Sequence, residues 1–130
     1  MDRRVLGADD AVARLEERRA AYERTAAATQ EMASRMQALT ATASDSNGLA
    51  TVTVDSGGGL LEAEFSARIQ RAVPEAVSRA LMEALAEAKR RIADQTQEII
   101  AGTVGADSET GRAVAQSLRE RLGPPAEGRP

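Results

Sequence analysis

Residues 48–69 read GLATVTVDSGGGLLEAEFSARI, two alternating runs of apolar and polar residues on either side of three glycines. Because successive side chains of a strand point to opposite faces, Ala50, Val52 and Val54 share one face of the first run. In the second run the apolar positions are Leu61, Ala63, Phe65, Ala67 and Ile69. The glycines supply the positive φ angles of a tight connection. The stretch predicts a β-hairpin, which needs cover for its apolar face and a partner for its edge.

The segment after the hairpin predicts the helix that covers it. Pro74 fits the first turn of a helix, and Glu75 complements the helix dipole there. Apolar residues then recur at helical spacing, at Val77, Leu81, Leu85, Ala88, Ile92 and Ile99. We expect this stripe to lie on the hairpin. The residues expected in the core or the dimer contact are Val52, Val54, Leu61, Phe65, Val77, Leu81, Leu85 and Ile92.

Residues 8–43 precede the hairpin and contain no Gly or Pro, which favours one long helix. With Val5 at heptad position a, the a and d positions form a weak apolar seam. They are Val5, Ala8, Val12, Leu15, Arg19, Tyr22, Ala26, Thr29, Ala33, Met36, Thr40 and Ala43. Ala and Thr bury little area, and Arg19 disfavours a continuous two-stranded coil. The turn-forming residues 44–48 are expected to end the helix.

The C-terminal part of the chain predicts one more short element. Gly102 and Gly105 end the covering helix, and residues 107–122 predict a short helix with Val114, Leu118 and Leu122 on one side. The last stretch, GPPAEGRP, predicts a flexible tail. The expected organisation is one α+β domain over residues 1–105, with its sheet completed in a dimer, and a C-terminal extension over residues 106–130.

The composition excludes most kinds of chemistry. The 130 residues include no His, Cys or Trp, which removes the usual proton shuttle, thiol nucleophile and soft metal ligand. Catalytic triads, zinc fingers and thiol redox motifs are therefore excluded, and we expect neither enzyme activity nor a cofactor. Only 23 residues are Leu, Ile, Val or Phe, whereas 27 are Ala. Because such a core is thin, a second copy is expected to complete it.

The charge balance limits the kind of nucleic-acid contact. Sixteen Arg and one Lys face twenty acidic residues, and the isoelectric point is near 5.1. DNA binding by such a chain must use a local basic patch. No run approaches the roughly 20 apolar residues that span a bilayer, and the opening MDRRVLGADD lacks the apolar segment of a signal peptide. We therefore expect no membrane contact and a cytoplasmic location.

Three passages resemble the YbaB/EbfC family of small bacterial nucleoid-associated proteins, over roughly residues 20–101. They are the Met- and Gln-containing passage from Met32 to Leu39, the pattern Gly48-x-x-x-Val52-x-Val54 with its glycine turn, and Ala84-Leu85-x-x-Ala88 before Arg90-Arg91-Ile92. The likeness rests on pattern and order. It implies an α-β-β-α protomer that dimerises through its sheet and helices and binds double-stranded DNA on the nucleoid with limited sequence preference.

The basic residues that the resemblance makes candidates for DNA contact are Lys89, Arg90, Arg91, Arg79, Arg18, Arg19 and Arg24. The chain departs from the Lys-rich ends of members that bind DNA well, and Ala86 stands where many members place Asn. Glu87/Arg91 and Arg90/Asp94 also have the spacing of helical ion pairs, so a solvated, ion-paired surface is the alternative. The corresponding rival function is a protein-interaction module, accessory to a secretion system or another assembly, that keeps the dimer fold without binding DNA.

Three further features have a functional and a structural interpretation. Glu62 and Glu64 share a strand face and suggest a carboxylate pair, but no third ligand is near in the sequence. Residues 57–59 suggest a phosphate-binding loop, yet the Gly-Lys-Ser/Thr and the helix that such a loop needs do not follow. Met32 and Met36 suggest an adaptable partner surface, although core or dimer packing is the expectation.

Overall fold

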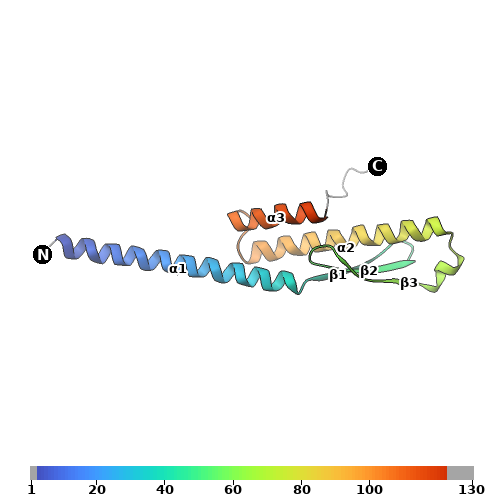
Figure 1. The fold of residues 1–130 in the computed structure, drawn as a ribbon, viewed down its shortest axis with the longest axis horizontal. Coiled ribbons are helices and arrows are strands. Elements are labelled where there is room, and N and C mark those ends of the chain that lie inside the picture. The colour runs from blue at the N-terminus through green and yellow to red at the C-terminus, as the bar shows by residue number, and fades with distance from the viewer. Residues whose placement is uncertain (1–2, 123–130) are drawn as a thin grey trace.

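A computed structural model describes residues 3–122 and shows an α+β fold, as the sequence predicts. The elements follow the chain as α1 (Arg3–Gln37), β1 (Thr40–Ser44), β2 (Ala50–Asp55), β3 (Leu60–Phe65), the 3-10 helix η1 (Ala67–Arg71), α2 (Pro74–Gly102) and α3 (Glu109–Leu122). Helix α2 lies along the sheet, α3 packs beside α2, and α1 projects beyond the rest of the molecule (Figure 1). The flexible tail predicted for residues 123–130 lies outside the described residues. No described helix combines the length and apolarity needed to cross a bilayer.

The predicted hairpin is present as β2 and β3, but its second strand ends at Phe65, and Ala67 and Ile69 of the predicted run lie in η1. The two strands pair antiparallel, with Ala50 opposite Phe65 and Val52 opposite Ala63. Their turn holds Gly58 at a φ of 85°, in the left-handed region that residues with a Cβ rarely adopt. The sheet has the order β1-β2-β3, so β3 forms one of its edges.

A β-bulge in the hairpin changes which leucine faces the helix. The register shifts between Thr53 and Val54, and Val54 lies opposite Leu60. Because residues directly opposite in an antiparallel pair share a face, Leu60 joins the face of Val54, where the strict alternation of the sequence had placed Leu61.

The prediction that the first helix continues to residue 43 is wrong. Helix α1 ends at Gln37, and residues 40–44 form β1, which pairs antiparallel with β2. The sequence TATAS alternates, so Ala41 and Ala43 are buried beneath α2, and the hydroxyls of Thr42 and Ser44 bond those of Thr53 and Thr51 at 2.8 and 2.7 Å. Since Ala favours helix and no Gly or Pro interrupts this stretch, local propensity suggested helix, and pairing with β2 overrides it.

The core lies between α2 and the two strands β1 and β2. The buried row of α2 consists of small residues and two isoleucines, namely Ala80, Ala84, Ala88, Ile92, Thr96 and Ile100. Val52 and Val54 face this row from β2 and are completely buried. The larger Leu81 and Leu85 of the predicted stripe lie beside this row and are half-buried against the same core, and Val77 is also half-buried. Small side chains let the helix approach the sheet closely, which an argument from hydrophobicity alone cannot detect.

Strand β3 is not covered within one chain. All six of its residues are exposed, with Phe65 at 41 % and Leu61 at 58 % of their full accessibility. The packing expected for Phe65 under the helix is therefore not made within one chain, because the main contacts of α2 on the sheet are with β1 and β2. An apolar edge strand is thus left open beside a well-covered β2.

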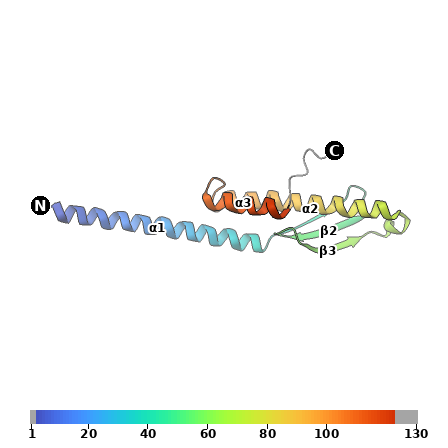
Figure 2. The ribbon, with the colours of Figure 1, turned by 45° about the horizontal axis from the view of Figure 1, so that its top comes forward.

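The predicted short C-terminal helix is present as α3 and packs on α2. Leu118 is 5 % exposed and belongs to the core, while Val114 and Leu122 are half-buried. Gly111 is buried where α3 starts, and a Cβ there would clash with the backbone oxygen of Gly105. The helix therefore fits closely against the turn that follows α2. In Figure 1 and Figure 2, α3 lies along the C-terminal part of α2, and the strands lie along its N-terminal part.

Candidate nucleic-acid interface

The basic cluster of α2 does not form a single free patch. Arg90 pairs with Glu87 at 2.9 Å, and Arg91 pairs with the same carboxylate at 3.5 Å. Arg91 also donates to the backbone oxygen of Thr42 in β1. Lys89 is half-buried on another side of the helix, where its side chain lies beside the Gly58 turn. The three consecutive residues point apart because each helical step turns about 100°.

Arg90 and Arg91 thus both make ion pairs within the chain. The Glu87–Arg91 pair has the spacing expected from the sequence, whereas Arg90 joins Glu87 in place of Asp94. Both arginines remain at least half exposed, so the pairs are surface ion pairs of small energy. Arg79, the candidate for DNA contact nearer the start of α2, is exposed.

The basic residues of α1 are more accessible. Arg18, Arg19 and Arg24 are exposed on the part of α1 that projects from the body. Arg24 also lines a shallow depression between α1 and the α2–α3 turn, together with Ala28, Val104 and Thr110. Glu16, Glu17 and Glu23 alternate with these arginines along the sequence and are exposed as well.

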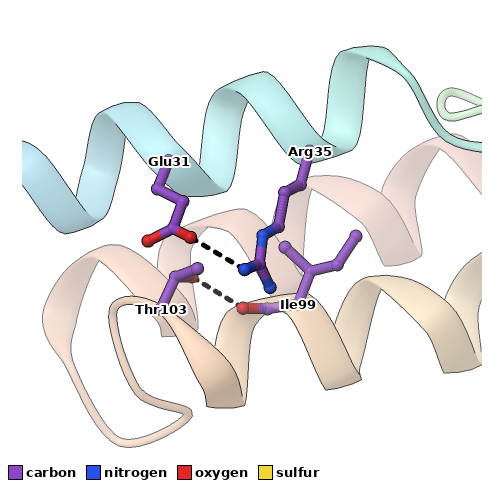
Figure 3. Close-up of polar contacts among 4 residues, drawn as sticks. All are labelled: Glu31, Arg35, Ile99 and Thr103. Atoms are coloured by element: carbon purple, nitrogen blue, oxygen red, sulfur yellow. Dashed lines mark hydrogen bonds and ion pairs between the residues drawn. The ribbon is translucent and has the colours of Figure 1, made fainter.

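The base of α1 is fixed against the end of α2. Met32 is 5 % exposed there, and the expectation of core packing for this residue is confirmed, whereas Met36 is half-buried. Figure 3 shows Glu31 and Arg35, paired at 2.8 Å, over the last turn of α2, where the Thr103 hydroxyl donates to the Ile99 oxygen at 2.6 Å. This junction sets the direction in which α1 and its arginines project.

The face of the sheet that points away from α2 is acidic at β3. Glu64 lies opposite Thr51 and Glu62 opposite Thr53, on the side of the Thr and Ser hydroxyls. The neighbouring Glu64, by sharing a proton and by repulsion, raises the pKa of Glu62 above its ordinary value. Residues 3–122 hold no group of three or more potential metal ligands. A negative face of this kind repels DNA phosphates.

Two of the three glycines of the β2–β3 turn donate to a carboxylate of the chain itself. Asp55 Oδ1 accepts hydrogen bonds from the backbone N–H groups of Gly57 and Gly59, at 3.0 and 2.7 Å. These are the donors that a phosphate would need in a phosphate-binding loop. The turn is therefore structural, in agreement with the strand that follows it.

The β1–β2 turn contains polar residues that sequence reasoning missed. Asp45 is 5 % exposed and accepts hydrogen bonds from the N–H groups of Ala50 at 2.7 Å and Asn47 at 3.1 Å. These backbone bonds, that from Ala50 above all, lower the pKa of Asp45. Glu83 of α2 accepts from Ser46 N–H at 2.8 Å, and Arg68 donates to the Asn47 oxygen at 2.6 Å. The Asp-Ser-Asn-Gly sequence was the signal, because such residues bond their own backbone in turns.

The long helix α1, which carries exposed arginines and glutamates and is packed at its base against a thin body of sheet and helices, gives the molecule an extended charged surface. The family model described as the YbaB/EbfC DNA-binding family matches residues 12–107, and the chain belongs to this family. It is therefore of the bacterial nucleoid-associated, DNA-binding type. No curated protein and no solved structure gives a match. The matched range ends two residues before α3 begins.

Proposed function

We propose that the chain is a homodimer that binds double-stranded DNA with little sequence preference, through the exposed arginines of α1. The observation that carries this proposal is the position of Arg18, Arg19 and Arg24 on a helix that projects from the body of a protein of a DNA-binding family. The α2 cluster is the weaker site, because Arg90 and Arg91 share Glu87. The protein would act on the bacterial nucleoid.

The proposed dimer uses the open edge of the sheet. Leu60, Leu61 and Phe65 are 52 %, 58 % and 41 % exposed on an edge strand, whose free backbone groups are suited to pairing with another chain. Burying large side chains there would complete the thin core that α2 forms over β1 and β2. A second copy is the occupant we propose.

The proposed mechanism is electrostatic. Arginines of the two copies would neutralise phosphates and release counterions, so that the affinity falls as salt rises, with a slope of about 0.9 for each phosphate neutralised. Tyr22 and Phe65 are the only aromatic side chains in the sequence, so stacking on unpaired bases contributes little. Contacts to phosphates position a protein without reading the sequence, which accounts for the low specificity proposed.

The test is a titration of the full chain into a labelled duplex of 30 base pairs at two salt concentrations, with the solution mass measured on the same sample. The variant R18A/R19A/R24A should weaken binding and lower the salt slope, by at most about 5 if all six arginines of a dimer contact phosphates. The matched variant K89A/R90A/R91A removes the same charge from α2 and should have the smaller effect. A larger loss in the α2 variant would refute the assignment to α1.

The same samples separate the dimer from DNA binding. Phe65→Asp places a charge at an exposed position of the single chain, so it should preserve the fold by circular dichroism while the solution mass falls below that of the wild type. An unchanged solution mass would remove β3 from the proposed interface. A wild-type dimer that ignores DNA even at low salt would favour the rival function, a module that binds a protein partner.

A further inference from the structure

The projecting part of α1 has no partner within the described chain. Every residue from Gly7 to Ala27 is exposed except Ala20, which is half-buried, and close packing begins only near Ala28 and Met32. Such a segment receives little support from its own chain, because helix nucleation is costly and tertiary packing supplies most of the stability of helices in proteins. A partner along this segment would provide that packing.

Large apolar side chains lie exposed along one stripe of this segment. Val12 is 53 %, Leu15 63 % and Tyr22 79 % exposed, at a or d positions of the heptad, with Arg19 at the a position between Leu15 and Tyr22. At 100° per residue, the stripe is turned by roughly a third of a circle from the face that meets α2 at Ala28 and Met32. A shallow depression lined by Tyr22, Thr25, Ala26, Thr29, Gln30 and Ala33 continues it toward the body. The intrachain packing of α1 therefore leaves this stripe free.

The charges that flank the stripe indicate what covers it. Heptad positions e hold Asp9, Glu16 and Glu23, all acidic and exposed, while the g positions of the same stretch hold Ala11, Arg18 and Thr25, among which Arg18 is the charged residue. In an antiparallel pair of α1 helices, e positions face e positions and carboxylates repel one another. In a parallel, in-register pair, position g faces position e of the next heptad, which places Arg18 beside Glu23 of the second copy.

We propose that the stripe formed by Val12, Leu15, Tyr22 and Ala26 binds the same stripe of a second copy as a parallel two-stranded coiled coil. Arg19 occupies an a position and would face Arg19 of the second copy, which weakens the pairing. A polar residue at one a position also favours a defined register. The pairing is independent of the proposed sheet dimer, and would join two such dimers if both form. Arg18 serves both this pairing and the proposed DNA contact, so the two compete, and the test is made without DNA.

The absence of cysteine from the sequence permits a direct test of register. Leu15→Cys places one thiol at a d position. A parallel, in-register pair brings this thiol beside the same thiol of the second copy, at a distance that a disulfide can span. Ala13→Cys, two residues away at the exposed b position, is the matched control. In a glutathione redox buffer at equal concentration, we expect the L15C chain to form at least ten times more disulfide-linked dimer than the A13C chain. Equal yields would overturn the proposal and leave the stripe to another partner.

Charge reversal tests the orientation independently. In the L15C background, Arg18→Glu and Glu23→Arg each place like charges across the pair, so each variant alone should cross-link several-fold less than its parent. An equal mixture restores opposite charges at both g–e contacts, so the heterodimer should exceed the 50 % that random pairing gives when the products are resolved by mass. A random distribution would overturn the parallel orientation. Circular dichroism of each variant, all altered at exposed positions, verifies that the chain is folded.

Discussion

Replacing Thr96 by Val should stabilise the protein. Thr96 is fully buried in α2, and its hydroxyl has no hydrogen-bond partner among the described residues. The hydroxyl loses its water on folding and gains no bond, which costs about 1–3 kcal/mol in proteins. Val has the same branched shape and a similar helix propensity, so the substitution removes the hydroxyl without leaving a cavity. We expect a gain of about 1–2 kcal/mol in the free energy of unfolding.

The assay is thermal and urea unfolding of both chains at one protein concentration, because association with a second copy would make the midpoint depend on concentration. A gain of 1 kcal/mol should raise Tm by about 3–5 °C in a chain of this size. Thr25→Val is the matched control, since Thr25 is exposed and its hydroxyl donates to the Ala21 oxygen at 3.0 Å, so its effect should stay within about 0.5 kcal/mol. Destabilisation of T96V by 1 kcal/mol or more would refute the reasoning, because it would mean that the hydroxyl is bonded.

Two further changes test the turns. Asp45→Asn should lower Tm at neutral pH. Because the folded pKa of Asp45 lies below its unfolded value, the difference in Tm between variant and wild type should shrink as the pH falls through the folded pKa. A difference in Tm that persists at acid pH would contradict the role of the charge. Gly111→Ala should lower the free energy of unfolding by about 1–3 kcal/mol, since the new Cβ meets the Gly105 oxygen. Gly102→Ala, with open space around the site, should be neutral or slightly stabilising. Equal effects of the two substitutions in urea unfolding would show that α3 does not fit closely against the turn.

The elements that the sequence predicted correctly are those whose signals are local. Alternation in residues 50–55 and 60–65, with glycines between them, gave the hairpin, and Pro74 with its helical spacing gave α2. β1 was missed because the choice between helix and strand for TATAS depends on β2, which lies several residues later in the chain. The bulge at Thr53 and Val54 was missed for the same reason, because only the pairing of two strands defines it.

The candidate site, like the fold, was predicted only in part from the sequence. The sequence identified the cations and the possible partner Glu87. It could not show that Arg91 reaches the Thr42 oxygen, nor that the glycine N–H groups of the β2–β3 turn are occupied by Asp55. The first contact depends on how α2 packs against β1, whereas the second is local to the turn, because Asp55 lies two and four residues from the glycines that donate to it.

The sequence by itself determined the α+β class, the glycine turn, the length of α2 and the lack of cysteine and histidine chemistry. Helix propensity and periodicity depend on residues that are neighbours in the chain, and composition does not depend on the order of the residues at all. Only the tertiary structure decided that α2 buries its alanine row, that β3 stays open and that the stripe on α1 faces away from the body. Burial depends on which surfaces meet, and small side chains allow the closest approach of a helix to a sheet even though each contributes little apolar area.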